Sequence, residues 1–256
     1  GVDCVVPNAG IAHTGRLEVS REGPRPVLLA ASRGIHGQPN LTALLAALLK
    51  RYATPVLVHG VDGMGAAPGD DDRRVGTPPN DAGVGRVTTA QVLWELGIEP
   101  AASLADAQAR LRHDGITYVP LAVLAPGLAR LLAPPRASPP AILRMLAMLI
   151  DPFAGDGYRV IGAASADDLT AIRELLLASR TDALLLRGTE GEPFADPRGG
   201  TPLEHVAGGV AASCADVDAE GSDREPSLPA ATDAVTTATW IASVLAGAEP
   251  VPPPIV

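Results

Sequence analysis

Short apolar runs and longer helical stripes alternate along most of this chain. The segment from Pro26 to Gly34 is apolar until it reaches a glycine turn, and Pro55 to Gly60 is a second run of the same kind. Between them, leucines recur at helical spacing over residues 38–50, with Asn40 as the predicted N-cap. The pattern predicts a strand, a glycine turn, a capped helix and a second strand, which together make a βαβ unit.

The alternation continues towards the C-terminus. Thr88 and Gln91 stand at capping-box spacing, with Gly97 placed as a helix end, and Ser103 begins a helix that ends near Gly115. Strands alternating with helices predict an α/β fold, with a mainly parallel sheet flanked by helices. The other predicted elements are strands over 116–120, 159–163 and 183–187 and helices over 141–149, 165–176 and 233–245.

The predicted α/β domain extends over residues 26–250. Residues 1–25 form an irregular segment without clear periodicity, and 251–256 form a tail. Residues 61–85 are rich in Gly, Pro and Asp and have no apolar period, so they are predicted to be a loop inserted into the domain.

Composition narrows the class of protein. Hydrophobic residues make up 46% of the 256 residues, which is ample for a core, whereas aromatic residues make up only 3% and offer few stacking platforms for bases. Two cysteines, Cys4 and Cys214, are too few for a disulfide scaffold, and a reducing, cytoplasmic location is favoured. No apolar segment is long enough to span a membrane, and no signal peptide is evident.

The net charge of −9 opposes binding to nucleic acid, because phosphate contacts need a local positive field. The charge is uneven, however, since residues 103–149 contain five arginines and two aspartates, a local excess of three positive charges. A modest basic face is therefore predicted beside acidic loops. Its candidate residues are Arg86, Arg110, Arg112, Arg136 and Arg144.

Several stretches resemble the large domain of the anthranilate phosphoribosyltransferases, the glycosyltransferase family 3 fold. These are residues 32–49, 55–60, 86–98, 183–198 and 228–250. The resemblance is closer to the divergent, TrpD-like branch of YbiB type, and the most specific of these stretches is Leu185-Leu-Arg-Gly-Thr-Glu-Gly-Glu192. The resemblance implies a phosphoribosyltransferase-like large domain with the N-terminal helical domain missing or truncated, so we expect a fragment or a truncated gene product.

The glycine turn after the first strand is the first candidate site. In the enzymes of this family a Gly-Thr-Gly-Gly-Asp loop holds the pyrophosphate of the donor, and the matching stretch here keeps two glycines but lacks the Thr and the Asp. A helix N-terminus after such a loop can bind phosphate. The alternative is that Asn40 is only a cap and the glycines only make a turn. The resemblance places the phosphate or nucleic-acid site on Ser32, Arg33, Gly34, His36, Gly37, Asn40 and Thr42.

A second group of candidates lies at the next strand end and the helix after it. His59 and Gly60 match a strand end that faces the ligand crevice in the family. Arg86, Thr88 and Thr89 combine an arginine with two hydroxyls at a helix N-terminus, which is a plausible phosphate site. A structural role for His59 is the stronger alternative, and simple capping by Thr88 is an equal one.

Glu190 and Glu192 stand in the region where the enzymes carry the acidic pair that binds Mg²⁺ on the donor. Magnesium needs few protein carboxylates when phosphates complete its shell. The adjacent Asp-Glu of the enzymes is missing, however, and solvated loop glutamates are the alternative. The acceptor-binding arginine of the family cannot be matched either, because residues 140–144 are mostly apolar.

The resemblance implies a cytoplasmic protein that binds phosphate-bearing ligands, with nucleic acid as the case implied by the YbiB-type branch. Two alternatives stay open: an active enzyme that transfers a phosphoribosyl group with Mg²⁺, and a truncated remnant without function. The expected partners are nucleic acid or a phosphoribosyl-type small molecule. A homodimer is possible, and no membrane contact is expected.

Overall fold

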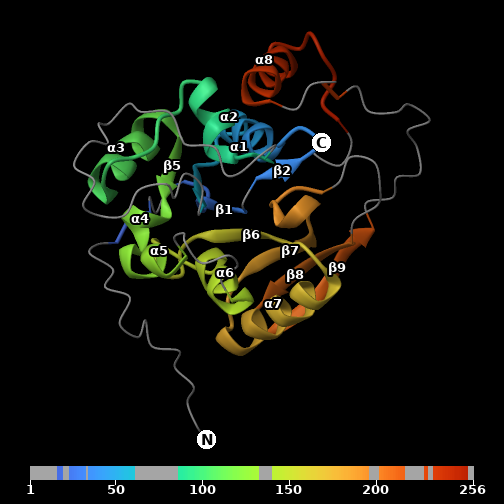
Figure 1. Ribbon diagram of the computed structural model, residues 1–256. Helices are drawn as coiled ribbons and strands as arrows, with labels where there is room; N and C mark the ends of the chain where they lie inside the picture. Colours follow the sequence, from blue (N-terminus) through green and yellow to red (C-terminus); the bar gives the residue numbers. More distant parts are fainter. Residues whose placement is uncertain are drawn as a thin grey trace, which may run out of the picture.

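The computed structural model describes residues 16–19, 23–32, 34–60, 86–132, 140–195, 202–216, 228–229 and 233–252. Within them, helices cover both faces of a mostly parallel sheet (Figure 1). The predicted α/β fold class is confirmed.

The described residues form a main sheet of seven strands in the order β5-β3-β1-β6-β7-β8-β9. Neighbours from β5 to β7 are parallel, and β8 and β9 add an antiparallel hairpin at one edge. A separate antiparallel pair joins β2 (Ile35–His36) to β4 (Arg86–Val87). The bounds in the main sheet are β1 Val27–Ala31, β3 Val56–Gly60, β5 Ile116–Pro120, β6 Tyr158–Ala163, β7 Ala183–Arg187, β8 Pro202–Ala207 and β9 Val210–Asp216.

The helices fall into groups on the two faces of the sheet. The group of α1, α2 and α8 packs on one face, and α3 to α7 pack on the other. No helix in the described part of the chain is long and apolar enough to cross a membrane. The bounds are α1 Thr42–Arg51, α2 Thr89–Glu95, α3 Leu104–Asp114, α4 Leu121–Leu124, α5 Pro126–Leu132, α6 Ala141–Met148, α7 Ala166–Ser179 and α8 Ala234–Leu245.

The apolar runs that predicted the central strands are buried on both faces of the sheet. Successive side chains of a strand point to opposite faces, so Leu28 and Leu29 of β1 enter two different parts of the core. Leu29 packs in the cluster that contains Leu44 of α1 and Ile241 of α8, and Leu28 packs in the cluster that contains Leu124 of α4. Burial on both faces explains why these strands are continuously apolar rather than alternating.

Most predicted helix ends are found where their capping residues placed them. Thr88 and Gln91 form a reciprocal capping box at the start of α2, and the Ser103 and Ser165 side chains accept backbone N–H groups at the starts of α3 and α7. Gly97 has a positive φ just after α2, as predicted for a helix end. One position was wrong: Leu41, rather than Asn40, occupies the N-cap position of α1 and makes no side-chain capping bond.

Several short elements were not predicted. The β8–β9 hairpin lacks a long apolar run because it lies at the sheet edge, where one strand is largely exposed. The helices α4 and α5 are short and each adjoins a proline, which obscures a helical period. Most of residues 1–25, the whole of 61–85 and the end of the tail lie outside the described residues, so the predicted domain limits stay predictions.

The strand order creates a crevice at the centre of the sheet. From β1 the chain moves outward to β3 and β5, and it later returns to place β6 on the other side of β1. The connection that follows β1 therefore runs towards one edge of the sheet, and the connection that follows β6 runs towards the other edge. The two connections diverge at the carboxyl ends of these strands. In parallel α/β sheets this reversal point is where ligands bind.

Candidate functional site

The loop over 32–37 follows β1, and its Gly34 and β2 lie against β4. Gly34 has a φ of +83°, and a Cβ there would lie 2.6 Å from the carbonyl oxygen of Val87. Only glycine fits this close approach. The loop is thereby held so that the N–H groups of Ser32, Gly34 and His36 all reach the turn that follows β7.

Glu192 is the anion that the inner donors of this loop surround. Its Oε1 accepts hydrogen bonds from the N–H groups of Ser32 at 2.9 Å and Gly34 at 3.3 Å. Its Oε2 accepts from the hydroxyl groups of Thr42 at 2.8 Å and Thr89 at 3.0 Å. The side chain is fully buried. Burial raises the pKa of Glu192, and the four hydrogen bonds oppose that rise.

Two glycines let the Glu192 turn press against the sheet. A Cβ at Gly162 of β6 would lie 2.1 Å from the carbonyl oxygen of Glu192, and one at Gly188 would lie 1.8 Å from the same oxygen. Any larger residue at either position would push the turn away from the loop. The position of the carboxylate therefore depends on strand β6 as well as on the turn itself.

Asn40 joins the starts of two helices beside this carboxylate. Its Oδ1 accepts the N–H of Thr42 at 3.1 Å, and its Nδ2 donates to the Thr89 hydroxyl at 3.1 Å and to the Val87 carbonyl at 3.3 Å. Its side chain is fully buried. Asn40 thus holds Thr42 of α1 and Thr89 of α2 at the spacing that lets both hydroxyls reach one carboxylate oxygen.

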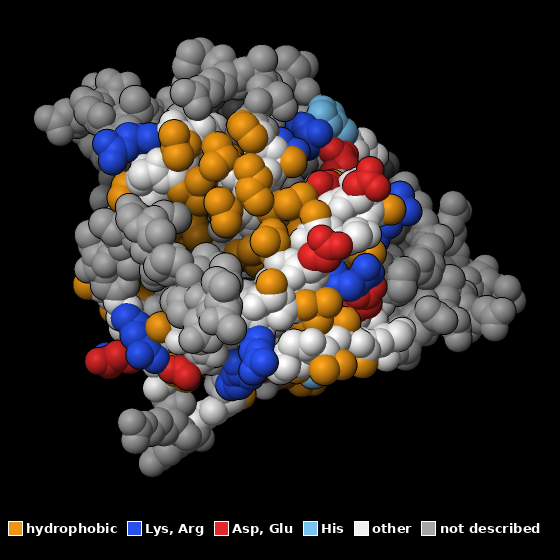
Figure 2. Space-filling view, turned by 90° about the horizontal axis from the view of Figure 1, so that it is seen from below, with side chains coloured by type: hydrophobic (Ala, Val, Ile, Leu, Met, Phe, Trp, Pro, Cys, Tyr) orange, Lys and Arg blue, Asp and Glu red, His pale blue; other side chains and the backbone are white. Residues whose placement is uncertain are grey.

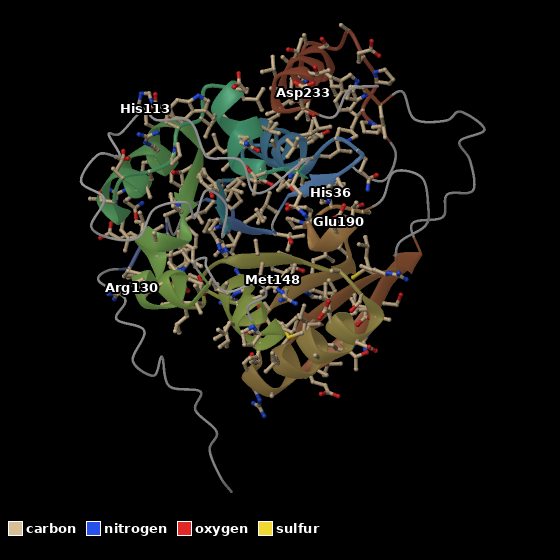
Figure 3. All side chains as sticks on the ribbon, in the orientation of Figure 1. His36, His113, Arg130, Met148, Glu190 and Asp233 are labelled. Atoms are coloured by element: carbon tan, nitrogen blue, oxygen red, sulfur yellow. The ribbon has the colours of Figure 1, made fainter. Side chains whose placement is uncertain are left out.

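Glu190 occupies the outer side of the same loop, next to His36 (Figure 3). Its Oε1 accepts the backbone N–H of His36 at 2.8 Å, and its Oε2 lies 2.8 Å from the Arg86 guanidinium. Arg86 also donates to the carbonyl oxygen of Gly34 at 2.6 Å. Unlike Glu192, the Glu190 side chain keeps 32% of its surface exposed.

An open cavity of about 640 Å³, counted out to its mouth, lies beside the loop at the carboxyl ends of β1, β3 and β6. Apolar side chains, including those of Met145 and Met148 of α6, form much of its wall, and Arg144 and Asp168 supply charge. On its outer surface, α6 also exposes the apolar side chains of Ile142 and Leu146. Figure 2, which views the molecule from below, shows apolar side chains gathered over this face with charged groups at their margin.

The imidazole of His59 is a buried polar group in the cavity wall. It is 1% exposed, and its Nε2 has no hydrogen-bond partner among the described residues. Burial, with a smaller effect from the charge of Arg159, lowers the pKa of His59 to about 4. The imidazole is therefore neutral near pH 7.

The structure brings most of the predicted site residues together. The network around the two glutamates contains Ser32, Gly34, His36, Asn40, Thr42, Arg86, Thr89, Glu190 and Glu192. His59 and Gly60 line the cavity instead, and Thr88 caps α2. Gly37 ends the loop with a φ of +65°, and Arg33 lies outside the described residues.

Gly162, Gly188 and Asp168 belong to the site but were not among the predicted site residues. A glycine inside the apolar run of β6 was a signal for Gly162, because glycine in a strand marks a close backbone approach. Asp168 offered no comparable signal, since it looks like an ordinary acidic residue in the first turn of a helix.

The carboxylates of Glu190 and Glu192 are both occupied by hydrogen-bond donors. They accept from N–H groups, hydroxyl groups or a guanidinium. Across the part of the chain that the structure describes, no group of three or more His, Cys, Asp or Glu residues could hold a metal ion. That Glu190 and Glu192 hold magnesium on a phosphate-bearing ligand stays a prediction, since Mg²⁺ needs few protein carboxylates when phosphates complete its shell.

Solved structures of anthranilate phosphoribosyltransferases share this fold. The enzyme TrpD from Thermus thermophilus matches 90% of this chain with a TM-score of 0.65 and 23% sequence identity. The enzyme from Saccharomyces cerevisiae, solved in complex with PRPP and Mg, matches 91% with a TM-score of 0.59 and 11% identity. The chain spans 64% and 59% of the lengths of these two enzymes. At such identities the likeness establishes the fold.

Sequence comparison establishes the family. No protein-family model matches the chain. The Escherichia coli (strain K12) protein named "Uncharacterized protein YbiB" is 32% identical over 244 residues, which make up 94% of this chain and 69% of that protein. Together the comparisons lead to one conclusion: the chain belongs to the YbiB family and has the fold of the anthranilate phosphoribosyltransferases.

Proposed function

We propose that this protein binds a phosphate-bearing ligand at the carboxyl ends of β1, β3 and β6. One observation carries the proposal: six hydrogen-bond donors converge on two carboxylates at the reversal point of the sheet. The donors are the N–H groups of Ser32, Gly34 and His36, the hydroxyls of Thr42 and Thr89, and the guanidinium of Arg86.

Such a set of donors is chemically an anion site, in which the buried Glu192 takes four donors and the partly exposed Glu190 takes the two that a ligand could reach. Backbone N–H groups at a glycine loop and helix N-terminus favour phosphate, and arginine matches the geometry of phosphate oxygens. The carboxylates of Glu190 and Glu192 mark the positions where these donors favour an anionic oxygen. The complex of the yeast enzyme with PRPP, a phosphate-bearing molecule bound by a protein of the same fold, supports this choice of ligand chemistry.

The cavity favours a small molecule that carries the phosphate, of the phosphoribosyl type. Its wall is largely apolar, with few polar groups, as is usual for sites that take small organic ligands. An organic group in the cavity would place a linked phosphate at the adjoining loop over 32–37.

Nucleic acid is the second candidate, because the chain belongs to the YbiB family and its resemblance to that branch implies nucleic-acid binding. The described arginines support it weakly. Arg110 and Arg112 both lie on α3 and are paired with Asp106 and Glu18, whereas Arg86 and Arg144 lie at the loop and the cavity. Phosphoribosyl transfer is not proposed, because the loop lacks the family's Thr and Asp.

The test is a titration of phosphoribosyl pyrophosphate, and separately of a short oligonucleotide, against the wild type and Gly37→Val. Gly97→Val is the matched control, because both glycines have positive φ and open space where a Cβ would stand, but Gly97 lies at the end of α2. We expect Gly37→Val to lose affinity and Gly97→Val to keep it. Equal affinity for all three proteins would refute phosphate binding at this loop.

A further inference from the structure

The two glutamates of the 188–192 turn differ in how firmly they are held. Glu192 is fully buried and accepts four hydrogen bonds, whereas Glu190 is partly exposed and accepts from His36 and Arg86. Partly exposed ion pairs contribute little to stability because water and salt screen them. Glu192 is therefore a fixed part of the fold, and Glu190 is an exchangeable ligand of the loop.

Resting on the function proposed above, we infer that the Glu190 carboxylate occupies the position of the ligand's phosphate and must leave it before a phosphate can bind. The donors that Glu190 takes, the His36 N–H and the Arg86 guanidinium, are the ones in this network that the buried Glu192 carboxylate does not occupy. A phosphate carries more charge than a carboxylate and more acceptor oxygens, so it competes for the same donors. Because a phosphate must first displace the Glu190 carboxylate, this side chain lowers the affinity of the loop for phosphate.

The backbone of the 188–192 turn is held in place on two sides, so only the Glu190 side chain is free to move. The Ser32 hydroxyl donates to the Glu190 carbonyl oxygen at 3.1 Å, which ties the turn to the loop. The close packing of Glu192 against Gly162 and Gly188 fixes the turn from the other side. The Glu190 carboxylate can therefore rotate into solvent while its backbone stays in place.

The conformation of Glu190 fits a specific role for this side chain. Its φ of 49° lies in the left-handed region, where non-glycine residues are uncommon. A glycine would adopt this conformation without strain, yet the chain carries a glutamate there and places its carboxylate against Arg86.

The experiment compares the affinity for inorganic pyrophosphate, by calorimetric titration, of the wild type and three variants. Glu190→Gln removes the competing charge, and Glu174→Gln removes the same charge from an exposed position on α7. Arg86→Gln removes the main cationic donor. We expect Glu190→Gln to bind about threefold to tenfold more tightly than the wild type, or ~0.7 to 1.4 kcal/mol. Glu174→Gln should change affinity less than about twofold, or ~0.4 kcal/mol.

The outcomes separate this inference from the proposed function. If the wild type binds, Arg86→Gln weakens binding and Glu190→Gln binds no more tightly, the competition is refuted while phosphate binding stands. Equal tightening by Glu190→Gln and Glu174→Gln would show a general effect of net charge and would also refute it. If neither the wild type nor Glu190→Gln binds pyrophosphate, both the inference and the proposed function fail.

Discussion

At the scale of single residues, the protonation of His59 should control the stability of the fold in mild acid. The folded-state pKa of about 4 lies below the unfolded value of 6.5. Between these two values the unfolded chain binds more protons, so stability falls as pH falls through this window and is fully present above it. The loss amounts to about 3 kcal/mol by pH 4.

Urea unfolding at a series of pH values from 7 to 4.5 tests this effect. The variant His59→Gln removes the titrating group, so its stability should decline less steeply over the window than that of the wild type. Parallel declines in the two proteins would show that other groups cause the acid sensitivity.

Glu192 should tolerate replacement by glutamine far better than by alanine. Its Oε1 faces two backbone N–H groups, which can only donate, whereas its Oε2 faces two hydroxyls, which can rotate and accept. A glutamine fits with its oxygen towards Ser32 and its amide nitrogen towards Thr42. Glu192→Ala leaves the buried donors without an acceptor and should cost about 3 kcal/mol or more, as measured by urea unfolding.

The pH dependence provides a control for Glu192. Because its pKa is raised, the folded state binds more protons than the unfolded chain between the unfolded and folded pKa values, so its contribution to stability is present at low pH and lost as pH rises through the folded pKa. Glu192→Gln should therefore gain stability relative to the wild type as pH rises from 4.5. A constant difference between the two proteins would contradict the raised pKa.

At the scale of elements, the contact between β6 and the 188–192 turn should be sensitive to a single added methyl group. Gly162→Ala would place a Cβ 2.1 Å from the Glu192 carbonyl and must displace the turn. We expect a loss of stability of about 1 to 3 kcal/mol, the usual cost of overpacking. Gly127→Ala in α5 is the control, because its Cβ meets nothing and helix propensity favours alanine by about 1 kcal/mol. Thermal unfolding of both variants measures the contrast.

The elements also show what a sequence can and cannot predict here. The central strands and capped helices were predictable because their signals are local: apolar runs and residues such as Ser103, Ser165 and Gly97. The site was predictable only in part. Ser32 was predicted in the glycine turn after a strand and Thr42 at a helix start, but nothing local indicated that the partner of both is a buried glutamate from a distant turn.

At the scale of the whole molecule, the distribution of arginines limits any binding to nucleic acid. Of the five arginines proposed for a basic face, two are paired with acids on or beside α3 and Arg136 lies outside the described residues. Arg86 and Arg144 lie at the site. Each neutralised phosphate contributes about 0.7 to 0.9 to the slope of log affinity against log salt, so we expect a slope of about −1 to −2.

Fluorescence anisotropy of a labelled oligonucleotide across a salt series measures this slope. Arg86→Gln should reduce the magnitude of this slope by about 0.7 to 0.9, the contribution of one phosphate contact. The reduction should be the same for different oligonucleotide sequences, since phosphate contacts carry no sequence information. A slope steeper than about −4 would indicate a more extensive basic surface than the described residues form. Complete absence of binding at low salt would remove nucleic acid as a candidate.

The distance along the chain between Ser32 and Glu192 has a consequence for biosynthesis. These partners are 160 positions apart, and β1 pairs with β6 only after more than half of the chain has been made. Contacts of such long range slow folding, because a large loop must close before they form. On the ribosome, the loop after β1 therefore emerges long before its internal carboxylate exists. During that interval its donors are open to water and to any anion or chaperone that the growing chain meets.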